Sequence, residues 1–181
     1  MNIICYGDSN TFGYDPRSYF GGRYESDCRW VDILAVKTGW NVHNNGMNGR
    51  RIPSREVVFP KSTDLLVVML GTNDLLQGNT VQMVLESMDC FLNCLNIDRN
   101  NILLVAPPPL QYGAWVSDQT LVDASVALGQ VYQELAERQE IHFADSGRWN
   151  ISISFNGVHF TEDGHKTFAE ELKSFISHHI I

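Results

Sequence analysis

The chain has 181 residues, of which 44% are hydrophobic and 19% charged, and its formal net charge is −8 at pH 7. This length suits one domain, which we expect to span residues 1–181, and the apolar content excludes a disordered chain. The negative charge argues against a protein that binds nucleic acid or an anionic membrane.

A strand is expected over Asn2–Tyr6, followed by a helix that begins near Trp30 and a second strand over Asn41–Asn44. A third strand over Leu65–Leu70 precedes an amphipathic helix with Thr80 as its N-cap. The third strand is continuously apolar, as strands covered on both faces are. Apolar and amphipathic segments therefore alternate from the start of the chain.

The second half of the chain repeats this alternation. A fourth strand, Ile102–Ala106, precedes a helix whose apolar stripe runs through residues 121–135. A fifth strand, Ile141–Ala144, precedes a last helix with Thr161 as its expected cap. Strands that alternate with helices predict an α/β domain with a parallel sheet.

The sequence has no pattern typical of a secretory signal, a membrane-spanning segment or a metal site. The chain begins with a short apolar segment and no basic leader, so we expect no secretory signal and a cytoplasmic location. No apolar run approaches the roughly 20 residues that cross a bilayer. The four cysteines lack the spacing of metal ligands, and we expect neither a metal nor a cofactor.

Small and polar residues follow the predicted strands, at 7–10, 45–49, 71–74 and 107–109, and a further group lies at 156–165. The carboxyl ends of parallel strands meet at one edge of a sheet, which is where α/β domains place their sites. We therefore expect these five segments to converge on a single rim.

Four of these stretches read GDSNTFGY (7–14), NNGMNGR (44–50), GTND (71–74) and NGVHFTEDGH (156–165). They resemble the motifs of the Ser-Gly-Asn-His hydrolases, also called GDSL-type esterases and lipases, and they occur in the family's order across the whole chain. The resemblance implies a three-layer α/β/α flavodoxin-like fold with a five-stranded parallel sheet of order 2-1-3-4-5. It also implies an esterase or carbohydrate O-deacetylase that cleaves small carboxylic esters.

The resemblance further implies a role for individual residues. Ser9 would be the nucleophile that forms an acyl-enzyme, with His159 as its general base, since a serine hydroxyl needs an adjacent base to attack a carbonyl. The backbone N–H groups of Ser9 and Gly46 and the side-chain amide of Asn73 would form the oxyanion hole. Gly46 is expected to approach the substrate closely or to adopt a positive φ angle, whereas Gly49 is expected to be an ordinary turn residue.

The last motif departs from the family at Asn156, where the usual residue is an aspartate that orients the histidine. In a chymotrypsin-like protease, the equivalent change lowers turnover about 10,000-fold through the wrong histidine tautomer. Three explanations stay open. The Asn156 oxygen or a backbone carbonyl orients the ring of a serine–histidine dyad, Glu162 or Asp163 replaces the aspartate, or the chain is a binding-only relative that retains the pocket.

Residues 10–29 form a long insertion after the expected nucleophile, and either a lid or a subunit contact in an oligomer would account for it. Aromatic residues in or beside the rim loops are candidates to line an acyl or sugar pocket: Phe12, Tyr14, Tyr19, Phe20, Tyr112 and Trp115. A flavin-binding domain is a remote alternative that only the sheet order suggests, because a fold does not determine a function.

Overall fold

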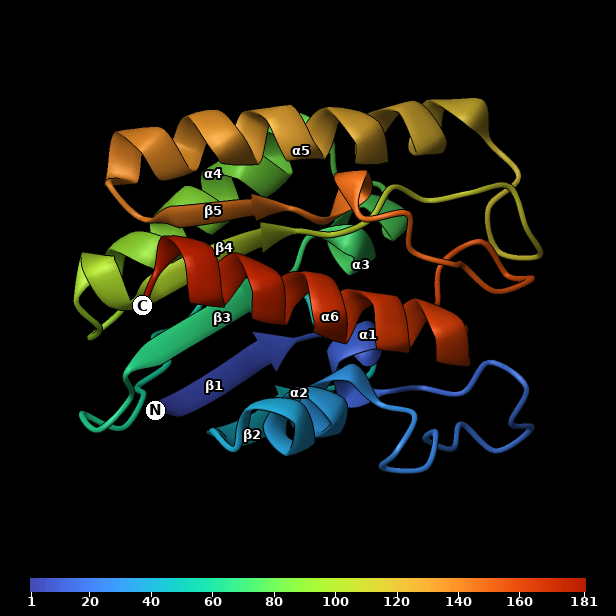
Figure 1. Ribbon diagram of the computed structural model, residues 1–181. Coiled ribbons are helices and arrows are strands. Elements are labelled where there is room, and N and C mark those ends of the chain that lie inside the picture. The colour runs from blue at the N-terminus through green and yellow to red at the C-terminus, as the bar shows by residue number, and fades with distance from the viewer.

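The computed structural model describes residues 1–181 and contains a five-stranded sheet with helices on both faces (Figure 1). The strands are β1 (Asn2–Gly7), β2 (Asn41–Gly46), β3 (Leu65–Met69), β4 (Ile102–Ala106) and β5 (His142–Asp145). All neighbouring strands are parallel, and their order is β2-β1-β3-β4-β5. The fold class and sheet order expected from the sequence are therefore confirmed.

Four long helices and two short ones lie between the strands or, in the case of the last helix, after β5. The long helices are α2 (Trp30–Thr38), α4 (Val81–Asn93), α5 (Gln119–Gln139) and α6 (Glu162–His179), and the short ones are α1 (Ser9–Phe12) and α3 (Thr72–Leu76). Two 3-10 turns, Arg99–Asn101 and Ser146–Arg148, complete the elements. The two expected caps are confirmed, because the side chains of Thr80 and Thr161 accept hydrogen bonds from backbone N–H groups three residues later. None of the helices combines the length and the apolar character that a membrane crossing requires.

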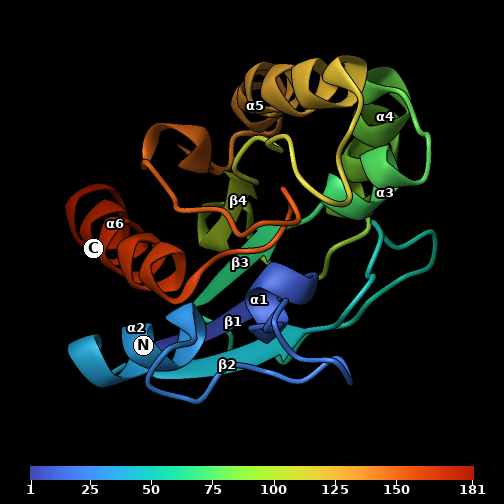
Figure 2. The same cartoon turned by 90° about the vertical axis from the view of Figure 1, so that its right-hand side faces the viewer.

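The sheet separates two hydrophobic clusters. Alternate residues of a strand point to opposite faces, so Ile4 and Leu66 pack on the side of α4 and α5, whereas Ile3 and Leu65 pack on the side of α2 and α6. Figure 2 shows these two helical layers on either side of the strands. Because both faces of the central strands are covered, every residue of β3 and β4 is buried.

The short helices α1 and α3 begin at the carboxyl ends of β1 and β3, at the sheet edge that faces the viewer in Figure 2. The chain turns from β1 into α1 so sharply that a Cβ atom on Gly7 would lie 2.1 Å from Thr11 Oγ1. Glycine is therefore required at this turn. The turn places the first residues of α1 above the centre of the sheet.

Candidate active site

Ser9 and His159 meet at the carboxyl edge of the sheet, although 150 residues separate them in the chain. Ser9 is the first residue of α1, and His159 lies in the loop before α6. The distance between His159 Nε2 and Ser9 Oγ is 3.0 Å, which is a hydrogen bond, and both residues are buried. The hydroxyl and the imidazole nitrogen are as close as a serine nucleophile and its base must be for a proton to pass between them.

Asp8 holds the turn that presents Ser9. Its Oδ1 accepts a hydrogen bond from the Asn10 N–H at 2.9 Å and thereby caps α1. Burial raises the pKa of the Asp8 carboxyl to about 7. Ser9 occupies the first turn of α1, where backbone N–H groups have no partner within the helix, so its own N–H is free to meet an incoming oxygen.

Asn156 contacts the other nitrogen of the His159 ring, with its side-chain amide in a definite orientation. Asn156 Oδ1 accepts hydrogen bonds from the backbone N–H groups of Val158 and His159, both at 3.1 Å. The Nδ2 group therefore faces His159 Nδ1, at 2.8 Å. The expectation that the amide oxygen orients the ring is wrong, because two backbone donors already occupy that oxygen.

This orientation determines where the imidazole proton lies. An amide nitrogen can only donate, so Asn156 Nδ2 requires His159 Nδ1 to be an acceptor without a proton. A neutral imidazole then carries its proton on Nε2 and donates to Ser9 Oγ. A general base needs the opposite tautomer, with a lone pair on Nε2. The observed contacts thus stabilise the resting tautomer that cannot accept the serine proton.

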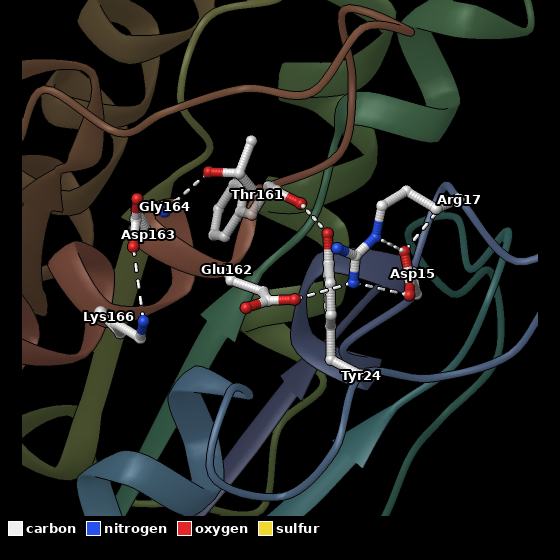
Figure 3. Close-up of polar contacts among 9 residues, drawn as sticks. Asp15, Arg17, Tyr24, Thr161, Glu162, Asp163, Gly164 and Lys166 are labelled. Atoms are coloured by element: carbon white, nitrogen blue, oxygen red, sulfur yellow. Dashed lines mark hydrogen bonds and ion pairs between the residues drawn. The ribbon is translucent and has the colours of Figure 1, made fainter.

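No carboxylate replaces the missing aspartate. Glu162 Oε1 accepts a hydrogen bond from Arg17 at 2.8 Å, and Asp163 pairs with Lys166 (Figure 3). Glu162 and Asp163 begin α6, where the capping bond from the Gly164 N–H to Thr161 turns the chain into the helix. Their partners lie on the surface, so the second explanation for Asn156 is wrong.

Gly46 does not lie where an oxyanion donor is needed. It is the last residue of β2, and its N–H donates to Asn44 Oδ1 at 3.0 Å. A Cβ atom at Gly46 would lie 2.1 Å from the Phe12 backbone nitrogen, so glycine is required for contact with α1 and not with a substrate. This geometry contradicts the expectation that the Gly46 N–H donates to an oxyanion.

Gly49 occupies the position expected for Gly46. It lines a cavity together with Ser9, Asn73 and His159, and its φ angle of +69° is in the left-handed region that favours glycine. Nothing lies within 4 Å of the place of its Cβ atom, and its N–H makes no hydrogen bond within the protein. Gly49, which was expected to be an ordinary turn residue, is thus the glycine with a free donor at the cavity.

Asn73 lies in the first turn of α3 and lines the same cavity. Its Nδ2 donates one hydrogen bond to the Arg50 carbonyl oxygen at 3.1 Å. That bond fixes the nitrogen end of the amide toward the loop that contains Gly49, and the second N–H has no partner within the protein. The side chain can therefore donate to a bound oxygen.

The cavity beside these groups has a volume of about 270 Å³ and is lined by Ser9, Tyr14, Asn48, Gly49, Asn73, Leu76, Trp115, Val158 and His159. Tyr14 and Trp115 both pack against the His159 ring, with centroid distances of 4.5 and 5.2 Å. A hydrogen bond from the Trp115 backbone N–H to the Asn156 carbonyl joins the loop of Trp115 to the loop that contains His159. Of the six candidate aromatic residues, these two line the cavity.

The insertion at 10–29 is attached to the site at its base and exposed at its tip. Tyr24 donates from its hydroxyl to the Phe160 carbonyl at 3.3 Å, and the Arg17 guanidinium lies over the Tyr24 ring (Figure 3). Tyr19 and Phe20 at the tip are 94% and 93% exposed. The base of the insertion is thus bonded to the residue after His159, and its Tyr14 lines the cavity.

Comparisons with known proteins identify the family of the chain and agree with its fold. Residues 5–167 match the GDSL-like Lipase/Acylhydrolase family. A structure from Agrobacterium tumefaciens assigned as an arylesterase is 25% identical, with all of each chain covered and a TM-score of 0.82. The aryl esterase of M. smegmatis is 23% identical over 97% of this chain and 98% of its own, with a TM-score of 0.82. A carbohydrate acetylesterase family member from Sinorhizobium meliloti is 24% identical over 97% of both chains, with a TM-score of 0.81. No curated protein sequence matches the chain.

Proposed function

The chain belongs to the GDSL-like lipase/acylhydrolase family and is a carboxylic ester hydrolase. From this premise we propose that Ser9 is its nucleophile and His159 its general base. The observation that carries the proposal is the 3.0 Å contact between Ser9 Oγ and His159 Nε2 beside a cavity. Free N–H donors at Gly49 and Asn73 on the same cavity support it.

In the proposed reaction, Ser9 Oγ attacks the ester carbonyl carbon while its proton passes to His159 Nε2. The carbonyl oxygen becomes an oxyanion and accepts hydrogen bonds from the Ser9 and Gly49 N–H groups and from Asn73 Nδ2. The intermediate then collapses, and the alcohol leaves with the proton from Nε2. Water, activated by the same imidazole, hydrolyses the acyl-serine and releases the carboxylic acid.

Asn156 restricts this cycle because it favours the His159 tautomer with its proton on Nε2. To act as a base, the ring must move that proton to Nδ1, where it would face the Asn156 amide nitrogen. The amide cannot simply rotate, because its NH₂ group would then face two buried backbone N–H donors. Each buried group left without a partner costs about 1–3 kcal/mol. The proposed reaction therefore proceeds through a minor tautomer.

The proposed substrates are small carboxylic esters. A cavity of about 270 Å³ accommodates a short acyl group, and Tyr14 and Trp115 offer aromatic surfaces beside it. Arylesterases and carbohydrate acetylesterases among proteins of the same fold support this class. The alcohol would extend from the cavity toward solvent.

The nucleophile can be tested by covalent labelling. A fluorophosphonate probe should modify the parent protein at Ser9, because attack by the activated hydroxyl displaces fluoride. Intact-mass analysis followed by peptide mapping would locate the adduct. Ser9→Ala serves as the control and should take up no probe. Labelling at another serine, or equal labelling of both proteins, would refute the assignment.

A binding-only role for the pocket is the alternative, and the amide contact at His159 Nδ1 is the observation that favours it. Under this alternative the parent protein and Ser9→Ala would hydrolyse p-nitrophenyl acetate at the same rate. A parent rate clearly above that of Ser9→Ala would exclude the alternative.

The pH dependence of kcat/KM should show that the proposed base, His159, is buried. Burial lowers the pKa of His159 to about 4 from the ordinary 6.5. A base acts in its neutral form, so protonation removes activity only below this lowered pKa. We expect kcat/KM to lose activity on the acid side near pH 4, measured with p-nitrophenyl acetate. A loss of activity near pH 6.5 that persists in Asp8→Asn, which removes the carboxyl with a pKa of about 7, would instead indicate a solvent-exposed histidine as the base.

A further inference from the structure

The residue that follows the proposed nucleophile connects it to the loop of the proposed base. Asn10 is 4% exposed, and its Nδ2 donates to the Val158 carbonyl oxygen at 3.1 Å. Its Oδ1 accepts from the Phe160 N–H at 3.0 Å. The two bonds lie on either side of His159, so one side chain holds both neighbours of the imidazole residue. Only one orientation of the amide satisfies both partners.

The backbone of residues 158–160 has six polar groups, and all of them are hydrogen-bonded. Asn10 provides two of the partners, and the others are the Asn156 side chain, the Tyr24 hydroxyl and the Ser154 N–H. Among these partners, Asn10 alone belongs to the helix that begins with the nucleophile. It is therefore the direct mechanical connection between the two proposed reacting groups.

The connection through Asn10 is more important for catalysis in a chain that has no carboxylate hydrogen-bonded to the histidine ring. An aspartate would orient the ring through a charged hydrogen bond, whereas Asn156 stabilises the resting tautomer. The placement of the imidazole then depends on the backbone that carries it. We propose that Asn10 is a positioning residue that sets the distance between Ser9 Oγ and His159 Nε2, an inference that rests on the proposed function.

The test replaces Asn10 with leucine, which has a similar size and makes neither hydrogen bond. Since small misplacements of reacting groups are costly, Asn10→Leu should lower kcat for p-nitrophenyl acetate by about 10- to 100-fold. Asn10 does not line the cavity, so KM should stay within about twofold. The rate of fluorophosphonate labelling at Ser9 should fall by a similar factor to kcat.

Asn96 offers a matched control at the opposite edge of the sheet. Its side chain makes the same pair of bonds, accepting from the Phe59 N–H and donating to the Phe59 carbonyl oxygen, both at 2.9 Å. Asn96→Leu should retain the kcat and the labelling rate of the parent protein. If Asn10→Leu also retains both, the positioning role is refuted while the proposed function stands. If the parent protein is not labelled at Ser9, the proposed function itself fails, and the inference fails with it.

Asn10→Asp gives a second test that does not require the leucine variant to fold. When protonated, the carboxyl can donate to the Val158 carbonyl and accept from the Phe160 N–H, as the amide does. The ratio of its kcat to that of the parent should therefore rise as the pH falls toward the titration range of the new carboxyl. Asp8 and His159 titrate nearby in both proteins, so the pH profile of the parent protein, which contains both groups, is the reference for this ratio. A ratio that does not change with pH would overturn the proposal.

Discussion

Replacement of Asn156 by aspartate should raise kcat/KM for ester hydrolysis by about 100- to 10,000-fold, the reverse of the loss seen when a catalytic triad aspartate becomes asparagine. One carboxylate oxygen can keep the hydrogen bonds from the Val158 and His159 N–H groups. The other takes the place of Nδ2, 2.8 Å from His159 Nδ1, and can only accept. The ring must then carry its proton on Nδ1 and present a lone pair to Ser9.

Two further measurements connect this gain to the tautomer. The negative charge favours the imidazolium, so the pKa of His159 should rise above about 4 and the acid limb of kcat/KM should move to higher pH. Nitrogen NMR of the imidazole should show the proton on Nε2 in the parent protein and on Nδ1 in the variant. Asn150→Asp, at an exposed position, adds the same charge and should change neither property. Equal activities of parent and Asn156→Asp, with both folded, would contradict the tautomer argument.

The sheet could be predicted from the sequence because burial leaves a strong pattern. The continuous apolar runs predicted β3 and β4 to within one residue, and β4 has the predicted bounds, Ile102–Ala106. The last two residues of β2, Asn45 and Gly46, and the short helices α1 and α3 were missed. A helix of four or five residues has no apolar periodicity to detect. Its polar residues instead have the composition of a turn.

Residue types could not show whether Gly46 or Gly49 has a free N–H at the cavity, since both lie in one Gly-rich segment. The answer depends on where β2 ends. Gly46 pairs with Gly7 and is still part of the sheet. Its N–H donates to Asn44 Oδ1, and its backbone packs closely against α1. Gly49 lies beyond the strand, where the backbone has left the sheet and its N–H is free.

The sequence singled out Asn156 as a departure from the family, but it could not show how the amide is oriented. That orientation depends on the direction of two backbone N–H groups in the loop at 158–159. Asn10 was missed for the same reason, because asparagine after a strand is ordinary turn chemistry. Its importance arises from bonds to residues almost 150 positions away. Long-range pairing of this kind leaves no local signal.

Replacement of Asn73 by alanine should lower kcat by about 100- to 1,000-fold, which is the usual effect of removing one oxyanion-hole donor. The side chain is held by its bond to the Arg50 carbonyl, so its second N–H is placed before a substrate arrives. A donor that is already in place stabilises the oxyanion more than it stabilises the neutral ester carbonyl. The loss should therefore appear mainly in kcat and much less in KM.

Asn73→Asp distinguishes the loss of the hydrogen-bond donor from a change in the shape of the side chain. The carboxylate has the same size, but it would repel both the Arg50 carbonyl and the oxyanion, so its kcat should fall at least as far as that of Asn73→Ala. Asn96→Ala, which removes an asparagine that also bonds to backbone groups but lies far from the cavity, should keep the parent kcat. Thermal unfolding of each variant would show which proteins remain folded. A folded Asn73→Ala protein with the parent kcat would remove this amide from the oxyanion hole and leave the N–H groups of Ser9 and Gly49 as its donors.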